Sequence, residues 1–251
     1  ALGSVENLAP RVRHRLVVPL LSDPIRGVRV EAARVLSGVP QVTFTPGQWE
    51  RLMEVLEEYR EAQHRNADWP ESHINLGLLH AQLGELDQAE QAYRRALTLD
   101  PQFVSAYVNL ADLYRLRNRD EAGERVLRDG LGVVFSDADL RHALGLALVR
   151  LKRTDEALEE LRRAADLRPE EPRYSYVYGV ALQGTGEVER ASEVLEAAHE
   201  RHPYDQELLY VLVATNYERG AKREALEFAR KLVEVVPGDP TFRSLVEELE
   251  S

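Results

Sequence analysis

Between residues 138 and 171, hydrophobic positions form two successive helical stripes. Apolar side chains recur at spacings of three and four in Leu140, Leu144, Ala147 and Leu148. A second such stripe consists of Ala157, Leu161, Ala164 and Leu167. These spacings place apolar side chains on one face of an α-helix. Only a short break near Lys152 separates the stripes, so the segment predicts a hairpin of two amphipathic helices.

The same pattern recurs every 34 residues, five times, without an insertion. Small residues recur at one position of each helix, as in Gly77, Gly145 and Gly179 of the first helix and Ala89, Ala157 and Ala191 of the second. A glycine inside a helix costs roughly 1 kcal/mol relative to alanine. Its recurrence at one position therefore indicates a close approach of the two helices. A fixed period of this length is typical of a stacked helical array that serves as a binding surface.

Each hairpin also carries signals for where its helices begin and end. The break holds residues that tolerate a left-handed backbone, namely Gly84, Asn118, Gly186 and Gly220. An acidic residue then opens the second helix, where the helix dipole favours negative charge: Asp87, Glu121, Asp155 and Glu189. A proline closes most units, because the residue before a proline avoids helical geometry: Pro101, Pro169, Pro203 and Pro237.

These positions resemble the tetratricopeptide repeat, which has small residues at its eighth, twentieth and twenty-seventh positions and proline at its thirty-second. The resemblance covers residues 70–237 as five repeats. It implies an all-α fold, a right-handed solenoid of helical hairpins that winds into a superhelix. The apolar stripe Phe242, Leu245, Val246 and Leu249 predicts a capping helix within residues 238–251.

The N-terminal residues follow a different pattern. Within residues 1–44, the sequence resembles one HEAT repeat, and the residues that match the repeat are Asp23, Val28, Arg29, Ala32 and Ala33. Residues 1–7 resemble the end of a preceding unit, so we expect a HEAT-like hairpin from a truncated array, docking onto more of the same polypeptide or another subunit. Residues 45–69 predict a bridging helix with Thr45 as N-cap and Pro46 in its first turn.

Composition and charge limit the chemistry of this chain. The net charge of −11 argues against generic nucleic-acid binding, which needs a basic surface. The absence of cysteine excludes disulfides, thiolate metal sites, cysteine nucleophiles and covalent haem c attachment within this chain. No apolar run is long enough to predict a membrane span.

Candidate catalytic and metal-binding residues are few. His73 and His80 lie seven residues apart on one predicted helix, where partial burial is the simpler interpretation than metal binding. His199 and His202 lie near a helix C-terminus, where the dipole favours them. Acidic residues of the second helices, such as Glu159 and Glu160, predict a solvated outer face. We therefore expect no enzyme activity and no cofactor or metal site in this chain.

The resemblance also implies a concave groove, lined by the fifth, ninth and twelfth positions of the first helices, with the sixth beside them. The residues that we expect to bind a partner there are Asn75, Asn109, Asp112, His142, Leu146, Tyr176, Val180, Tyr210, Ala214 and Tyr217. Toward the C-terminus this set is apolar and aromatic, which favours a peptide or partner helix with apolar anchors. Alternatively, Tyr176 and Tyr210 pack between neighbouring first helices.

Three functions follow from these patterns. The first is a non-catalytic scaffold that binds a protein or peptide. The second comes from a narrower resemblance, carried by residues 20–36 and 107–115, to the C-terminal part of bacterial multihaem c-type cytochromes. It implies a docking module whose haem motifs would lie upstream, a c-type cytochrome partner, and a periplasmic or extracytoplasmic location instead of a cytoplasmic one. The third is an assembly factor that holds an unfolded client.

Overall fold

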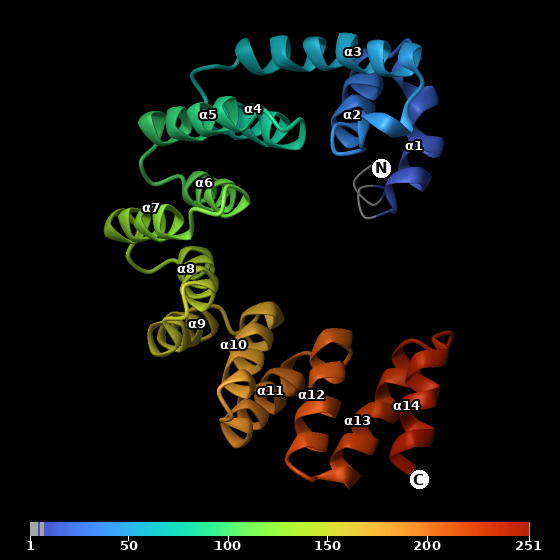
Figure 1. Ribbon diagram of the computed structural model, residues 1–251, viewed down its shortest axis with the longest axis vertical. Helices are drawn as coiled ribbons and strands as arrows, with labels where there is room; N and C mark the ends of the chain where they lie inside the picture. The colour runs from blue at the N-terminus through green and yellow to red at the C-terminus, as the bar shows by residue number, and fades with distance from the viewer. Residues whose placement is uncertain (1–4, 6–7, 251) are drawn as a thin grey trace. The chain divides into compact units, whose positions relative to one another are not determined.

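The chain folds into successive helices in a computed structural model that describes residue 5 and residues 8–250 (Figure 1). In this described part all regular structure is helical, which confirms the all-α prediction. Residues 1–7, interpreted above as the end of a preceding repeat, lie outside the described residues except for Val5. The contacts divide the chain into two compact units, residues 1–126 and 127–251.

Ten helices form the repeats, and corresponding helices begin 34 residues apart. The first helices are α4 (Pro70–Gln82), α6 (Val104–Leu116), α8 (Ala138–Arg150), α10 (Pro172–Gly184) and α12 (Gln206–Glu218). The second helices are α5 (Leu86–Leu99), α7 (Asp120–Val133), α9 (Thr154–Leu167), α11 (Val188–Arg201) and α13 (Lys222–Val235). The helix α14 (Pro240–Glu250) follows and packs against α13, burying Phe242 and Leu249.

The recurring glycines permit the close helix contacts that the sequence predicted. A Cβ atom added to Gly145 would lie 2.6 Å from Cγ of Leu161, and one added to Gly179 would lie 2.6 Å from Cγ of Leu195. Both distances are too short for two carbon atoms, so a large residue on the second helix fills the space above each glycine. The expected close approach of the two helices is therefore confirmed.

The fifth hairpin reverses this arrangement. Val213 occupies the position of the glycines on α12, and Ala229 occupies the position of the leucines on α13. Both are buried in one hydrophobic cluster, with exposures of 4% and 0%. The side-chain volume at this contact has thus moved from the second helix to the first.

The turns inside the hairpins use the left-handed backbone that the sequence predicted. The dihedral angle φ is 77° at Gly84, 54° at Asn118, 82° at Gly186 and 79° at Gly220. Lys152 occupies the same position of the third hairpin and has a φ of 60°. Because Lys152 carries a Cβ atom, the turn between α8 and α9 is more strained than its glycine counterparts.

The N-terminal unit begins with α1 (Pro10–Val17), the 3-10 turn η2 (Val18–Ser22) and α2 (Arg26–Leu36). A second 3-10 turn, η3 (Gln41–Thr43), leads into the long helix α3 (Pro46–His64). Thr45 caps α3 as predicted: its side chain accepts from the Gln48 backbone, and the Gln48 side chain accepts from the Thr45 backbone. This reciprocal pair fixes the first residue of the helix.

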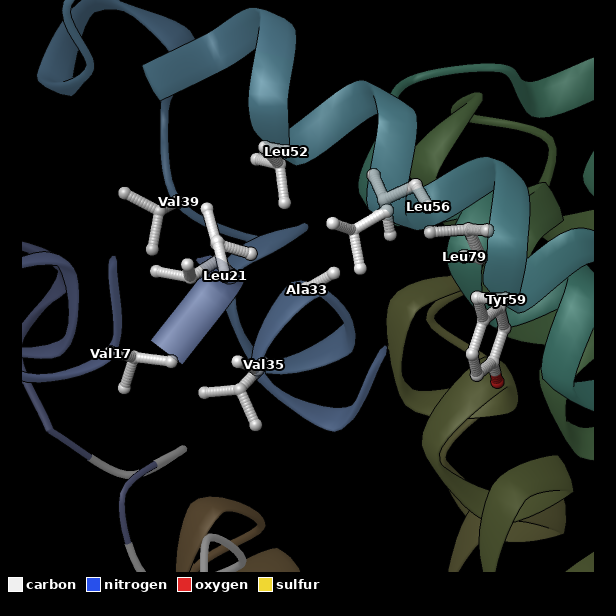
Figure 2. Packing of buried hydrophobic residues seen from close by; sticks show 12 residues of the cluster. Val17, Leu21, Ala33, Val35, Val39, Leu52, Leu56, Tyr59 and Leu79 are labelled. Carbon is white, nitrogen blue, oxygen red and sulfur yellow. The ribbon is translucent and has the colours of Figure 1, made fainter. Parts of the chain in front are cut away.

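A hydrophobic cluster joins these N-terminal elements to the first repeat (Figure 2). Leu21 of η2, Ala33 of α2, and Leu52 and Leu56 of α3 are at most 1% exposed within it. Leu79 of α4 belongs to the same cluster. The helix predicted between residues 45 and 69 therefore packs in a hydrophobic core with the N-terminal elements. This core also includes a residue of the first repeat.

Candidate partner-binding groove

Two apolar cavities lie on the second unit, residues 127–251. The larger has a volume of about 330 Å³ and is formed by α8, α9 and α10. Its walls include Leu146, Val149, Leu158, Leu161, Val177 and Val180. Leu146 and Val180 are two of the residues that the sequence indicated for partner binding, and Val180 is 40% exposed.

The smaller cavity has a volume of about 130 Å³ and lies where α12 meets α14. Tyr210, Ala214 and Tyr217 line one side of it, and Leu245 and Glu248 line the other. The two tyrosines are 54% and 59% exposed, so more than half of each side chain is accessible to a partner. All three α12 residues belong to the set expected to bind a partner, and α14 supplies the opposite wall of this cavity.

Tyr176 and His142 are placed differently from these exposed residues. Tyr176 is half-buried and packs against the cluster that contains Leu195 and Leu208, as the packing alternative anticipated for it. His142 is only 7% exposed, and its ring centroid lies 5.0 Å from that of Tyr174. We expected His142 in the groove, but its ring is covered and cannot contact a ligand without rearrangement.

The burial of His142 also determines its charge. Neither ring nitrogen of His142 has a hydrogen-bond partner. The pKa of His142 is lowered to about 4, mainly by desolvation and also by the nearby charge of Arg173, which together outweigh the opposing effect of Asp139. His142 is therefore neutral near pH 7 and acts as a core residue.

The expected groove residues of the first unit are polar and make contacts within that unit. The Asn75 side-chain amide donates to Oε1 of Gln63 at 3.2 Å. Nε of Arg115 donates to Oδ1 of Asp112 at 3.1 Å. Asn109 is half-buried. These three residues are polar, whereas the two cavities of residues 127–251 are lined mainly by apolar side chains.

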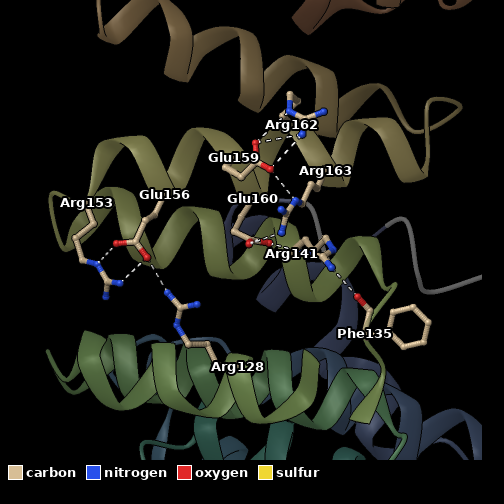
Figure 3. A network of polar contacts seen from close by, with 9 residues as sticks. All are labelled: Arg128, Phe135, Arg141, Arg153, Glu156, Glu159, Glu160, Arg162 and Arg163. Carbon is tan, nitrogen blue, oxygen red and sulfur yellow. Dashed lines mark hydrogen bonds and ion pairs between the residues drawn. The ribbon is translucent and has the colours of Figure 1, made fainter. Parts of the chain in front are cut away.

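The acidic side chains of α9 form ion pairs (Figure 3), although Glu156 and Glu159 stay 50% and 42% exposed, as expected for a solvated face. Arg141 on α8 contacts Glu160 on α9 at 2.7 Å, and their side chains are 16% and 13% exposed. A second guanidinium nitrogen of Arg141 donates to the Phe135 carbonyl oxygen at 2.6 Å. The interpretation of Glu160 as a solvated residue was wrong, because it joins two helices of one hairpin.

Two further glutamates of α9 also bind arginines. Glu156 accepts from Arg153 and Arg128, and Glu159 accepts from Arg162 (Figure 3). Hydrogen bonds from Arg153 and Arg162 hold the pKa values of Glu156 and Glu159 below their ordinary range. These glutamates of α9 are therefore paired, whereas the two cavities are lined mainly by unpaired apolar side chains.

The histidines considered for metal binding each have a separate partner. His73 Nε2 lies 2.8 Å from the Ala67 carbonyl oxygen, and His80 Nδ1 lies 2.5 Å from Oε2 of Glu85. Within the described residues, no group of three or more His, Asp or Glu side chains is arranged to hold a metal ion. The same residues contain no helix long and apolar enough to cross a membrane.

Sequence reasoning missed part of the larger cavity. It assigned the groove to the first helices, whereas Thr154 and Leu158 of the second helix α9 also line this cavity. The stripe of α9 predicted from Ala157 and Leu161 shows why: Leu158 lies beside that stripe, at its edge. An apolar residue next to the core stripe was therefore the available signal.

Comparisons with known proteins agree with this architecture. A family model described as "Tetratricopeptide repeat" matches residues 28–204, and a second with the same description matches residues 179–240. The first match begins inside α2 and includes α3, so it extends beyond the five repeats that the sequence register identified.

Curated relatives match the chain over part of their length. Human protein O-mannosyl-transferase TMTC3 is 29% identical over 123 residues, which are 48% of this chain and 13% of the relative. TPR repeat-containing protein YpiA of Bacillus subtilis is 20% identical over 152 residues, 61% of this chain and 36% of the relative. Heat shock protein STI1 of Saccharomyces cerevisiae is 30% identical over 90 residues, 36% and 15% of the two chains. The chain thus spans about a third or less of these relatives.

Solved structures share the fold at low identity. The structure from the characterisation of Pseudomonas aeruginosa pilF has a TM-score of 0.59 and 22% identity, covering 77% of this chain and 83% of its own. YrrB, described as a TPR protein with an unusual peptide-binding site, has a TM-score of 0.54 and 23% identity, covering 76% and 97%. A MamA structure has a TM-score of 0.55 and 21% identity, covering 66% and 91%.

Proposed function

Because this chain belongs to the tetratricopeptide repeat family, we propose that it is a non-catalytic scaffold that binds a partner protein on the face of residues 127–251 that carries the two cavities, here called the inner face. The observation that carries the proposal is the pair of apolar cavities on this face, which are bordered by exposed Val180, Tyr210 and Tyr217. Exposed apolar surface of this kind is typical of protein interaction sites. The peptide-binding site described for YrrB, which shares this fold, supports the same type of function.

The tyrosines should contribute most of the binding energy. Large aromatic side chains dominate interfaces when a partner covers them, since they bury much area with little loss of conformational entropy. Tyr210 and Tyr217 meet this condition because each lines a cavity while more than half of its surface is exposed.

The test compares tyrosines inside and outside the groove. A partner is first captured on the full chain by cross-linking, purified, and titrated against each variant. The double variant Tyr210→Ser/Tyr217→Ser should weaken binding by about tenfold or more. Tyr204→Ser is the matched control, because Tyr204 is 80% exposed and lines neither cavity. Equal losses in the two variants would place the binding site elsewhere.

The captured partner also separates the finer functions. A folded c-type cytochrome that binds with unchanged haem absorbance would support the docking-module function. A protein that binds only while unfolded, and is released on folding, would support the assembly-factor function. A folded partner of another kind would leave the general scaffold function alone.

A further inference from the structure

The inner face changes character along the repeats at the sixth position of the first helix. Asn75 and Asn109 occupy this position in the first two repeats, and Asn75 is exposed. The next three repeats carry Ala143, Val177 and Val211 there, of which Ala143 and Val177 are partly exposed and Val211 is buried. The second unit therefore lacks the asparagine amides that the first unit carries at this position.

This loss of amides matters for the type of segment that can bind. An extended peptide presents its backbone N–H and C=O groups, and covering them with an apolar surface leaves them unsatisfied at a cost of roughly 1–3 kcal/mol each. Gln183 could supply an amide, but its Nε2 already donates to Oε2 of Glu218 at 2.6 Å. An α-helix satisfies its own backbone and needs only apolar contacts from the groove.

The charges beside the groove indicate the polar side of such a helix. Glu218 follows Tyr217 on α12 and reaches Gln183 on α10. Within the described residues Glu218 forms no ion pair, and the neutral amide of Gln183 leaves its negative charge uncompensated. A segment with lysine or arginine beside its apolar anchors complements this arrangement.

We propose that the inner face of residues 127–251 binds an amphipathic, basic α-helix of a partner protein, with one apolar anchor in each cavity. This inference rests on the proposed function and specifies its ligand. The cavities lie between α8 and α10 and between α12 and α14, two repeats apart along the first helices. Packed helices lie about 8–10 Å apart, so the anchors are separated by about 16–20 Å.

This separation gives the spacing of the anchors in the partner. A helix rises 1.5 Å per residue, so about 11–13 residues cover the distance between the cavities. Eleven residues make about three full turns, which returns a side chain to the same face of the helix. The expected ligand therefore has apolar residues at i, i+4, i+7 and i+11, with basic residues flanking the last of them.

The probe is a fluorescent peptide of about 18 residues with leucines at this spacing, lysines beside the last leucine, and alanine and glutamine elsewhere. Its control is identical except for two prolines in place of central alanines, which prevent a helix. Binding to the full chain is followed by fluorescence anisotropy. The helical peptide should bind about tenfold or more tightly than the proline peptide.

Two pairs of protein variants locate the site. Val180→Gln should weaken the helical peptide by about tenfold, whereas Leu167→Gln should not, since Leu167 is also 40% exposed but lines neither cavity. Glu218→Gln should weaken the peptide several-fold and reduce the dependence of binding on salt. Glu193→Gln, an exposed position on the second helix α11, is its control.

The outcomes separate this inference from the proposed function. If the proline peptide binds as well as the helical one and Val180→Gln weakens both, the groove binds an extended segment and the helix inference fails alone. If peptide binding is absent or insensitive to Val180→Gln, the helix inference fails, and the captured partner decides the proposed function independently. Sedimentation that shows self-association lost in Val180→Gln would identify a second copy as the occupant and overturn the inference.

Discussion

The fourth hairpin pairs Gly179 with Leu195, whereas the fifth pairs Val213 with Ala229. This exchange of side-chain volume can be tested by introducing the residue types of the fifth hairpin into the fourth. Gly179→Val adds three carbon atoms at a position where even a Cβ would lie 2.6 Å from Cγ of Leu195. Overpacking of this kind costs about 1–3 kcal/mol. Leu195→Ala removes three carbon atoms from a fully buried site and should cost about 2–5 kcal/mol.

The double variant conserves the number of carbon atoms and reproduces the pair found in the fifth hairpin. Volume-conserving exchanges in a core usually cost less than about 1.5 kcal/mol. The double variant should therefore be more stable than Leu195→Ala alone, although it carries one more substitution. The expected coupling energy between the two sites is about 1 kcal/mol or more in the stabilising direction.

Urea denaturation followed by circular dichroism measures the free energy of unfolding, and hydrogen exchange over residues 172–201 reports on this hairpin alone. Tryptophan fluorescence is unsuitable, because Trp49 and Trp69 both lie in the first unit. The control combines Gly179→Val with Leu232→Ala, a buried residue of α13 in another cluster, and should show additive losses. Additive losses in the Gly179/Leu195 pair as well would refute the volume argument.

Three further substitutions test local features. Lys152→Gly should raise the free energy of unfolding by about 0.5–1 kcal/mol, because glycine relieves the left-handed strain at φ 60°; a lower urea midpoint would contradict this. Thr45→Ala should lower the free energy of unfolding by about 1 kcal/mol through loss of the capping box, as measured by urea denaturation monitored by Trp49 fluorescence. An unchanged denaturation curve would show that the cap contributes nothing to stability. Unfolded His142 binds a proton near pH 6.5 and folded His142 near pH 4, so stability should fall as the pH drops through this window. His142→Phe should remove that part of the pH dependence, and equal pH slopes in both proteins would refute it.

The repeat helices were predictable because their determinants are local. Gly84, Asn118, Gly186 and Gly220 mark turns that are indeed left-handed. The spacing alone also located the turn at Lys152, although its residue type gives no such signal. Thr45 similarly indicated the beginning of α3, since a cap and its partner lie only three residues apart.

Features that depend on contacts between helices were less predictable. The position of His142 within its repeat indicates the inner face, but its burial depends on Tyr174 of α10, the first helix of the next repeat. Glu160 looked solvated on α9 because its partner, Arg141, belongs to α8. The larger cavity likewise combines three helices, and only the side chains contributed by first helices were named from the sequence.

The reversed volumes of Val213 and Ala229 have a consequence for how the array assembles. Helices of similar length and stripe could pair with the wrong neighbour while the chain folds, and such misassembly is typical of repeat proteins. If α12 packed on α11 instead of α13, Val213 would meet Leu195, and two large side chains would occupy the same space. Docking α10, with Gly179, on α13 would instead leave a void beside Ala229. Each mispaired hairpin is therefore less stable than the native one. The contact between Val213 and Ala229 thus favours the pairing of α12 with α13 over pairing with helices of other repeats.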